Sequence, residues 1–192
     1  MLRSIYDWTL EKARHRHAER WLALVAFAES SVFPVPPDVM LLPMALAERR
    51  CAFRYAAIAT MASVAGAFAG YAIGAFLWQT VGAPLIQLYG YEAEFARFRE
   101  GFVDYGAWLV FIFGVTFFPF KVITIASGLV ALDPVVFALS ALVARGLRFF
   151  PEAALLWRFG APIQRFIERR LALLSTLFVA LLLLGFLALK LL

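Results

Sequence analysis

Six ionisable side chains interrupt long apolar stretches of the sequence. They are Glu29, Asp38, Lys121, Arg145, Arg148 and Glu152. A charged group within a bilayer costs about 2.5 to 3.5 kcal/mol on insertion scales, so it needs a partner or a function. The negative charges of the acids that come first along the chain nearly cancel the positive charges of the bases that follow. We therefore expect them to meet in one polar, water-accessible cavity between the two halves of the protein.

The basic residues predict a site for phosphate. Arg145 and Arg148 are three residues apart, so on a helix they project from the same face. Two guanidinium groups form a fork that suits phosphate oxygens, and Lys121 would add a third positive charge. The alternative is structural pairing, because Arg148 and Glu152 have the i,i+4 spacing of a helical ion pair.

The first two acids predict proton coupling. Burial favours the protonated form of a carboxyl group, so Glu29 and Asp38 are candidates to take up and release protons while a substrate moves. Glu29 has a structural alternative, in which it caps a helix or bridges the two halves.

The composition predicts an integral membrane protein rather than a soluble helical one. Of the 192 residues, 64% are hydrophobic, and the mean hydropathy is +0.82. The stretch from Leu171 to Leu189 contains no charged residue, and about 20 apolar residues span a bilayer core. Four further apolar segments are Trp21 to Ala47, Tyr55 to Trp78, Tyr105 to Leu132, and Pro134 to Trp157.

Charge between these segments predicts the topology. Lys and Arg number five in residues 1–20, three in residues 48–54 and four in residues 158–170, whereas residues 79–104 hold two beside four acids. Basic loops stay in the cytoplasm, so the chain should start there, and residues 21–47 should enter and leave on the same side. Prolines break a helix, so Pro34, Pro36 and Pro37 should form the tip of a re-entrant hairpin.

The second half repeats this plan in the opposite sense. Residues 105–132 are interrupted at Pro119 and have an acidic residue at each flank, which predicts a second hairpin that enters from outside. Each hairpin precedes a span, 55–78 or 134–157, and each span is followed by Trp and then Gly-Ala-Pro. The pattern is typical of an inverted repeat, in which substrate sites lie near the midplane.

The predicted fold class is therefore an all-α integral membrane protein. It has a basic cytoplasmic arm at 1–20, a membrane domain at 21–162, and a linker with an extra C-terminal transmembrane helix at 163–192. Residues 91–105 should form either a short interfacial helix or a solvated connector. Gly66, Gly70 and Gly74 have the four-residue spacing of a close helix contact, either within the chain or in a homo-oligomer.

Several functions are disfavoured. The only cysteine is Cys51, and the two histidines, His15 and His17, lie in the basic arm, so we expect no metal and no cofactor. The net charge of +5 is spread over short flanking segments rather than one stripe, which indicates lipid headgroups rather than nucleic acid. A membrane enzyme such as a lipid phosphatase would need an activated nucleophile or a metal cluster, and the sequence offers neither within the membrane.

Four stretches together resemble the DedA family, also called the SNARE-associated or VTT-domain membrane proteins, and within it the YqaA-like branch. They are FAESSVFPVPPD, GAFAGYAIG, FFPFKVITIASGLV and RGLRFFPEAALLWRFG, which lie between about Trp21 and Pro162. The resemblance implies two opposing re-entrant hairpins, with Glu29 and Asp38 at the family's membrane-embedded acids. The family usually has two arginines around the second proline, where this chain has Thr116 and Lys121.

The resemblance also implies lipid movement driven by the proton gradient. We expect a flippase or scramblase of the bacterial inner membrane that moves an anionic phospholipid or a polyprenyl phosphate such as undecaprenyl phosphate. The alternative is a proton-coupled transporter of small ions or cationic drugs, in which the acids bind the substrate. A structural or assembly role is a further alternative, in which Glu29 could be replaced by glutamine without loss.

Overall fold

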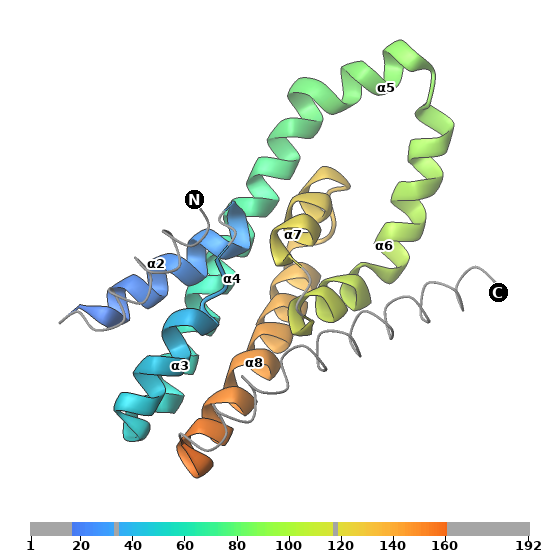
Figure 1. Cartoon of the computed structure of the whole chain (residues 1–192). Coiled ribbons are helices and arrows are strands. Elements are labelled where there is room, and N and C mark those ends of the chain that lie inside the picture. The colour runs from blue at the N-terminus through green and yellow to red at the C-terminus, as the bar shows by residue number, and fades with distance from the viewer. Residues whose placement is uncertain (1–16, 33–34, 117–118, 161–192) are drawn as a thin grey trace, which may run out of the picture.

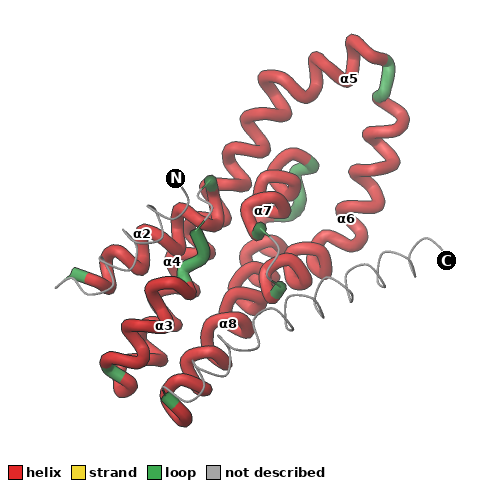
Figure 2. Tube along the Cα trace, in the orientation of Figure 1, coloured by secondary structure: helices red, strands yellow, loops and turns green. Residues whose placement is uncertain are grey.

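The computed structural model describes residues 17–32, 35–116 and 119–160, and these residues form helices and short connections without any strand (Figures 1 and 2). The predicted all-α class is therefore confirmed for this part of the chain. Two continuous helical stretches are long and apolar enough to cross a membrane, Arg49–Gly82 with 34 residues and Pro134–Phe159 with 26. Most of the predicted basic arm, Pro34 and the predicted C-terminal helix lie outside the described residues.

The first helix–break–helix unit consists of α2 (Ala18–Ser31) and α3 (Asp38–Ala47). The helix stops just before the proline-rich stretch and restarts after Pro37, whose φ of −61° suits a helix start. Pro43 lies inside α3. A 3₁₀ turn, η1 (Arg49–Cys51), then leads into α4 (Ala52–Leu77). The helix is therefore interrupted at the predicted proline-rich stretch.

The helix that begins with α4 does not stop at its tryptophan. It passes through a π-helical turn, η2 (Trp78–Gly82), into α5 (Ala83–Tyr89), which ends at Gly90 with a positive φ of 69°. Gly82 keeps an ordinary helical φ of −62°, so Pro84 falls in the first turn of α5, where proline is tolerated. In the second half α8 (Pro134–Phe159) ends at Gly160 with a φ of 61°. The Ala-Pro of the second Gly-Ala-Pro lies outside the described residues, so the predicted repeat of this motif stays a prediction.

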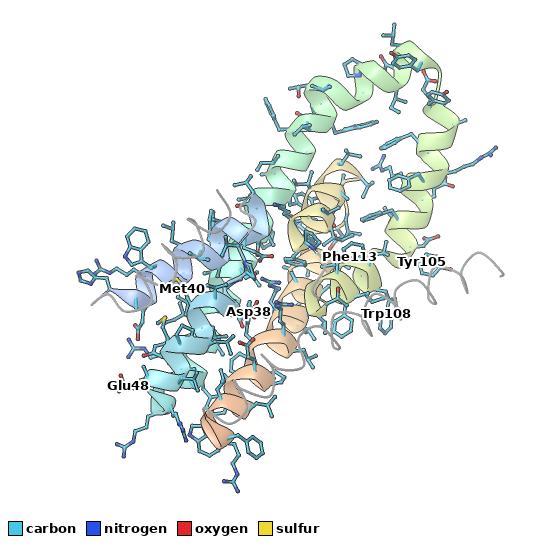
Figure 3. The ribbon with its side chains drawn as sticks, in the orientation of Figure 1. Asp38, Met40, Glu48, Tyr105, Trp108 and Phe113 are labelled. Atoms are coloured by element: carbon cyan, nitrogen blue, oxygen red, sulfur yellow. The ribbon has the colours of Figure 1, made fainter. Side chains whose placement is uncertain are left out.

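The predicted helix at 91–105 is present, but it is part of a longer helix rather than a separate element. Residues from Glu92 to Val115 form one helix, α6, so the first arm of the second hairpin begins well before Tyr105. Its axis changes direction near Tyr105 (Figures 1 and 3). The first half of α6 is polar and the second half is apolar, which suggests two elements. The helix nevertheless continues through the bend.

The second helix–break–helix unit joins α6 to α7 (Phe120–Leu129). Pro119 stands at the helix start with an extended ψ of 104°, so it marks the predicted interruption. The Asp133 carboxylate then accepts hydrogen bonds from the backbone N–H of Val135 and Val136, both at 2.9 Å, and caps α8. Pro151 lies inside α8, which runs back along α4.

The glycine stripe of α4 lies against both hairpins. A methyl group at Gly66 would overlap the Phe27 carbonyl of α2, and one at Gly74 would overlap the Ile125 carbonyl of α7. Between them, Gly70 faces Thr124 and the Ser30 carbonyl. Glycine thus allows α4 to approach two other helices at backbone distance. These contacts are internal to the chain, so this face of the stripe is not free for a second copy.

Replacing Gly66 by alanine is expected to lower the free energy of unfolding by about 1 to 3 kcal/mol, because the added methyl group overpacks a backbone contact. Gly146 of α8 is the matched control, since a methyl group there meets nothing within 4 Å. Gly146→Ala should be neutral or stabilise by about 0.5 to 1 kcal/mol through helix propensity. Unfolding of the purified protein in mixed micelles checks both variants, and equal effects would contradict the packing explanation.

The two ends of the molecule differ in charge. Arg49 lies against Gly160 at the carboxyl end of α8, where a cation complements the helix dipole. Arg54 pairs with Glu19 at the start of α2, with 2.7 Å between Nη2 and Oε2. The basic ends of α2, α4 and α8 therefore meet at one end, while α5 lies at the other (Figure 1).

Candidate functional site: two buried charge pairs

The first pair joins α2 to α8. Nη2 of Arg145 lies 2.5 Å from Oε2 of Glu29, and the two side chains are 2% and 13% exposed. Glu29 is in the last turn of α2, so the break in the first hairpin leaves it close to the middle of the fold. A buried ion pair needs good geometry and further hydrogen bonds to offset the loss of hydration.

Two serines supply those hydrogen bonds. Nε of Arg145 donates to Oγ of Ser63 on α4 at 2.6 Å, and the Ser63 and Ser30 hydroxyls are 2.5 Å apart. The Ser30 hydroxyl donates to Oε2 of Glu29 at 3.2 Å. If Ser63 donates to Ser30, the four groups form a closed ring in which every hydroxyl both donates and accepts. Three helices are thereby fixed around one guanidinium group.

The second pair joins α3 to α8. Nη2 of Arg148 lies 2.6 Å from Oδ2 of Asp38, at the first turn of α3, and Nη1 donates to the Thr116 carbonyl at 3.0 Å. Figure 3 shows Asp38 between the start of α3 and α8. The Glu152 carboxyl, one turn beyond Arg148, lies within hydrogen-bonding reach of the Asp38 carboxyl. Arg148 therefore connects the first hairpin to the end of α6.

Aromatic rings cover both arginines. The guanidinium carbon of Arg145 lies 4.9 Å from the Phe120 ring centroid and 4.8 Å from that of Phe149. Arg148 lies 5.9 Å from the Phe149 ring. Cations over ring faces gain about 0.5 to 2 kcal/mol depending on hydration. The rings also keep water from the guanidinium planes.

The structure brings the predicted acids and arginines together but separates them into two pairs. Arg145 and Arg148 do not form one open fork, because each binds its own carboxylate. The predicted water-accessible cavity is closed around Arg145, whose side chain is 2% exposed. Hydrophobic residues of α4 and α8 and the serines fill the space instead, since separated charges in an apolar interior are costlier than paired ones.

Lys121 lies in the first turn of α7 and contacts the end of α2. Its Nζ donates to the Val32 carbonyl at 3.4 Å, so it bridges the tips of the two hairpins. A second bridge runs from the Thr124 hydroxyl to the Ser30 carbonyl at 3.0 Å. The breaks at Pro36, Pro37 and Pro119 thus bring the ends of α2 and α7 side by side.

Sequence reasoning missed three groups at the site. Ser63 is one turn before Gly66, so its position on the packed face of α4 was a signal that it would point inward. Phe149 follows Arg145 by four residues, a spacing that places a ring beside the guanidinium on a helix. The hydrogen bond to the Thr116 carbonyl could not be predicted from sequence. This carbonyl is available to Arg148 only because α6 ends at Val115.

Replacing Ser63 by alanine is expected to lower the free energy of unfolding by about 1 to 3 kcal/mol, because Arg145 and Ser30 each lose a buried hydrogen-bond partner. Ser127→Ala is the control, since the Ser127 hydroxyl is also buried but bonds only to the Ile123 carbonyl of its own helix. Its loss should cost less than about 1 kcal/mol. Unfolding in mixed micelles measures the difference, and a larger loss for Ser127→Ala would contradict the ring.

Other features lie outside this site. A cavity of about 680 Å³ lies between α5 and the first half of α6, beside the stacked rings of Trp78 and Phe95. Among the residues that the structure describes, no three His, Cys, Asp or Glu side chains are arranged to hold a metal ion.

Two bacterial proteins are similar to almost the whole chain. An uncharacterized protein of Haemophilus influenzae is 37% identical over 169 residues, which cover 86% of this chain and 88% of that protein. The uncharacterized protein HI0703 homolog of Histophilus somni is 33% identical over the same shares of both chains. The chain belongs to the HI0703 homolog family. No family model and no solved structure matches the chain.

Proposed function

We propose that this member of the HI0703 homolog family is a membrane lipid transporter of the DedA type, a flippase or scramblase for an anionic phospholipid or a polyprenyl phosphate. The observation that supports it is the pairing of Arg145 with Glu29 and of Arg148 with Asp38 inside an apolar helical chain. Buried charges are costly and mark substrate or ion pathways in membrane proteins.

The pairs suggest how a phosphate group would be handled. A guanidinium group binds carboxylate and phosphate oxygens with similar geometry, so a lipid phosphate competes with Glu29 or Asp38 for the same donors. Protonation of the carboxylate removes its charge and releases the arginine to the phosphate. Since the acids come from the first hairpin and the arginines from α8, this exchange also unlocks one half of the protein from the other.

The proposed membrane arrangement follows the charges at the two ends. Both helix–break–helix units enter as re-entrant hairpins from opposite sides, and α4 and α8 cross. The end that carries Arg49 and Arg54 faces the cytoplasm by the positive-inside rule. We propose accordingly that the N-terminus lies in the cytoplasm and that the protein belongs to the bacterial inner membrane.

Leaflet exchange in liposomes tests this function. Purified protein is reconstituted with labelled lipids of several headgroups, with and without a pH gradient. Anionic lipids should exchange faster than in empty liposomes, and Arg145→Lys should lower the rate at least tenfold, because lysine keeps the charge but loses the bidentate grip. The surface variant Arg54→Gln should keep the rate.

Two outcomes would contradict the proposal. Rates equal to those of empty liposomes for every lipid would remove lipid transport. Retained lipid exchange in Arg145→Lys would remove the phosphate role of that residue. Export of a cationic dye by both wild type and Arg145→Lys, without lipid exchange, would instead favour the small-cation transporter.

A further inference from the structure

Glu152 is the fifth charged side chain of the buried cluster, and each arginine of the cluster already pairs with another carboxylate. Arg145 pairs with Glu29, and Arg148 pairs with Asp38. The Oε1 atom of Glu152 is buried without a hydrogen-bond partner among the described residues. The cluster thus contains three carboxyl groups and two guanidinium groups, and full ionisation would leave a net negative charge in an apolar interior.

The contact between Glu152 and Asp38 requires a proton. Two ionised carboxylates only accept hydrogen bonds, so one of a hydrogen-bonded pair must carry the hydrogen. Asp38 accepts from Nη2 of Arg148 and is therefore the partner held in the ionised form. The remaining carboxyl, Glu152, is then the donor, with its O–H directed at Asp38.

Among the helices that the structure describes, no further charged group changes this count. On α3 the only charged residue is Asp38, and α4 has none between Arg54 and Trp78. The charged residues of α2 are Glu19 and Arg20 at its far end and Glu29, which Arg145 engages. Those of α6 end at Asp104, and Lys121 of α7 donates to the Val32 carbonyl. On α8 itself, Arg158 lies in the last turn.

We propose that the Asp38–Glu152 pair is a proton-binding site, in which Glu152 is neutral at neutral pH and hydrogen-bonds to ionised Asp38. Release of this proton to water leaves two carboxylates against the single guanidinium of Arg148. The repulsion between the two carboxylates pushes α3 away from α8. Binding or release of the proton therefore controls how closely α3 packs against α8. The site is distinct from Glu29, and it does not depend on which substrate the protein moves.

Infrared spectroscopy of the full-length protein tests the site directly. Protein made by cell-free synthesis with glutamate carrying ¹³C in the side-chain carboxyl is reconstituted in liposomes at neutral pH. The C=O stretching band of a protonated carboxyl is well separated from that of a carboxylate. Wild type should show this band, shifted by the label. Glu152→Gln should lose it, and the glutamine amide still donates to Asp38, so the fold should survive.

Glu29→Gln and the surface variant Glu48→Gln are the controls and should keep the band. Absence of a labelled protonated band in wild type overturns the proposal, whether or not Glu152→Gln folds. Loss of the band in Glu29→Gln with retention in Glu152→Gln would also overturn it and assign the proton to Glu29. Because the readout needs no transport, failure of lipid exchange leaves this result unaffected.

Discussion

Arg145→Ala is expected to lower the free energy of unfolding by about 3 to 5 kcal/mol, because it leaves the Glu29 carboxylate buried without its counter-charge. The Ser63 hydroxyl loses its donor at the same time, so three helices lose their common contact. Unfolding in mixed micelles, followed by circular dichroism, measures the effect.

Arg54→Ala is the matched control for this prediction. Its pair with Glu19 has a similar distance of 2.7 Å, but the side chains are 67% and 36% exposed. Exposed pairs contribute about 0 to 1 kcal/mol, so this variant should unfold almost like wild type. If Arg54→Ala and Arg145→Ala lowered the free energy of unfolding equally, burial would not explain the contribution of the Arg145–Glu29 pair.

Glu29→Ala is expected to cost about as much as Arg145→Ala, roughly 3 to 5 kcal/mol, since it leaves the guanidinium uncompensated in the same place. The double variant Glu29→Ala/Arg145→Ala should lose less than the sum of the two single losses by about 0.5 to 3 kcal/mol, because it leaves neither charge behind. A full cycle of the four proteins in mixed micelles gives this coupling energy. Strict additivity would contradict direct pairing.

The same double variant separates folding from transport. If the pair serves only to hold the helices together, a double variant that regains stability should also regain leaflet exchange. We expect no exchange, because the proposed phosphate ligand is missing. Exchange at the wild-type rate in a stable double variant would contradict a role for Arg145 in transport.

The breaks in the helices could be predicted from local sequence. Proline removes a backbone donor and clashes with the preceding turn, so breaks were expected at Pro36, Pro37 and Pro119, and the helices stop there. The local rule does not decide every case, because α3 and α8 continue through Pro43 and Pro151. The composition likewise predicted an all-helical chain. The bend within α6 could not be predicted this way, because a change from polar to apolar composition looks the same in one helix as in two.

The pairing within the site depends on long-range packing. That acids and arginines meet follows from the cost of isolated charge in an apolar interior. Which acid meets which arginine depends on the rotation and height of α8 against the first hairpin, which no local pattern sets. The position of Glu152 shows this, because its i,i+4 spacing from Arg148 suggests a helical pair, whereas its carboxyl also lies beside Asp38 of α3.

Pro151 gives α8 a weak point beside the charged cluster. Proline has no N–H, so the Leu147 carbonyl receives no hydrogen bond from the next turn, one residue before Arg148. A rigid rod would have to shift its whole length to draw Arg148 away from Asp38. Because one backbone hydrogen bond of α8 is already absent at Pro151, the helix can bend there without breaking a second one. The rest of α8 then stays packed against α4.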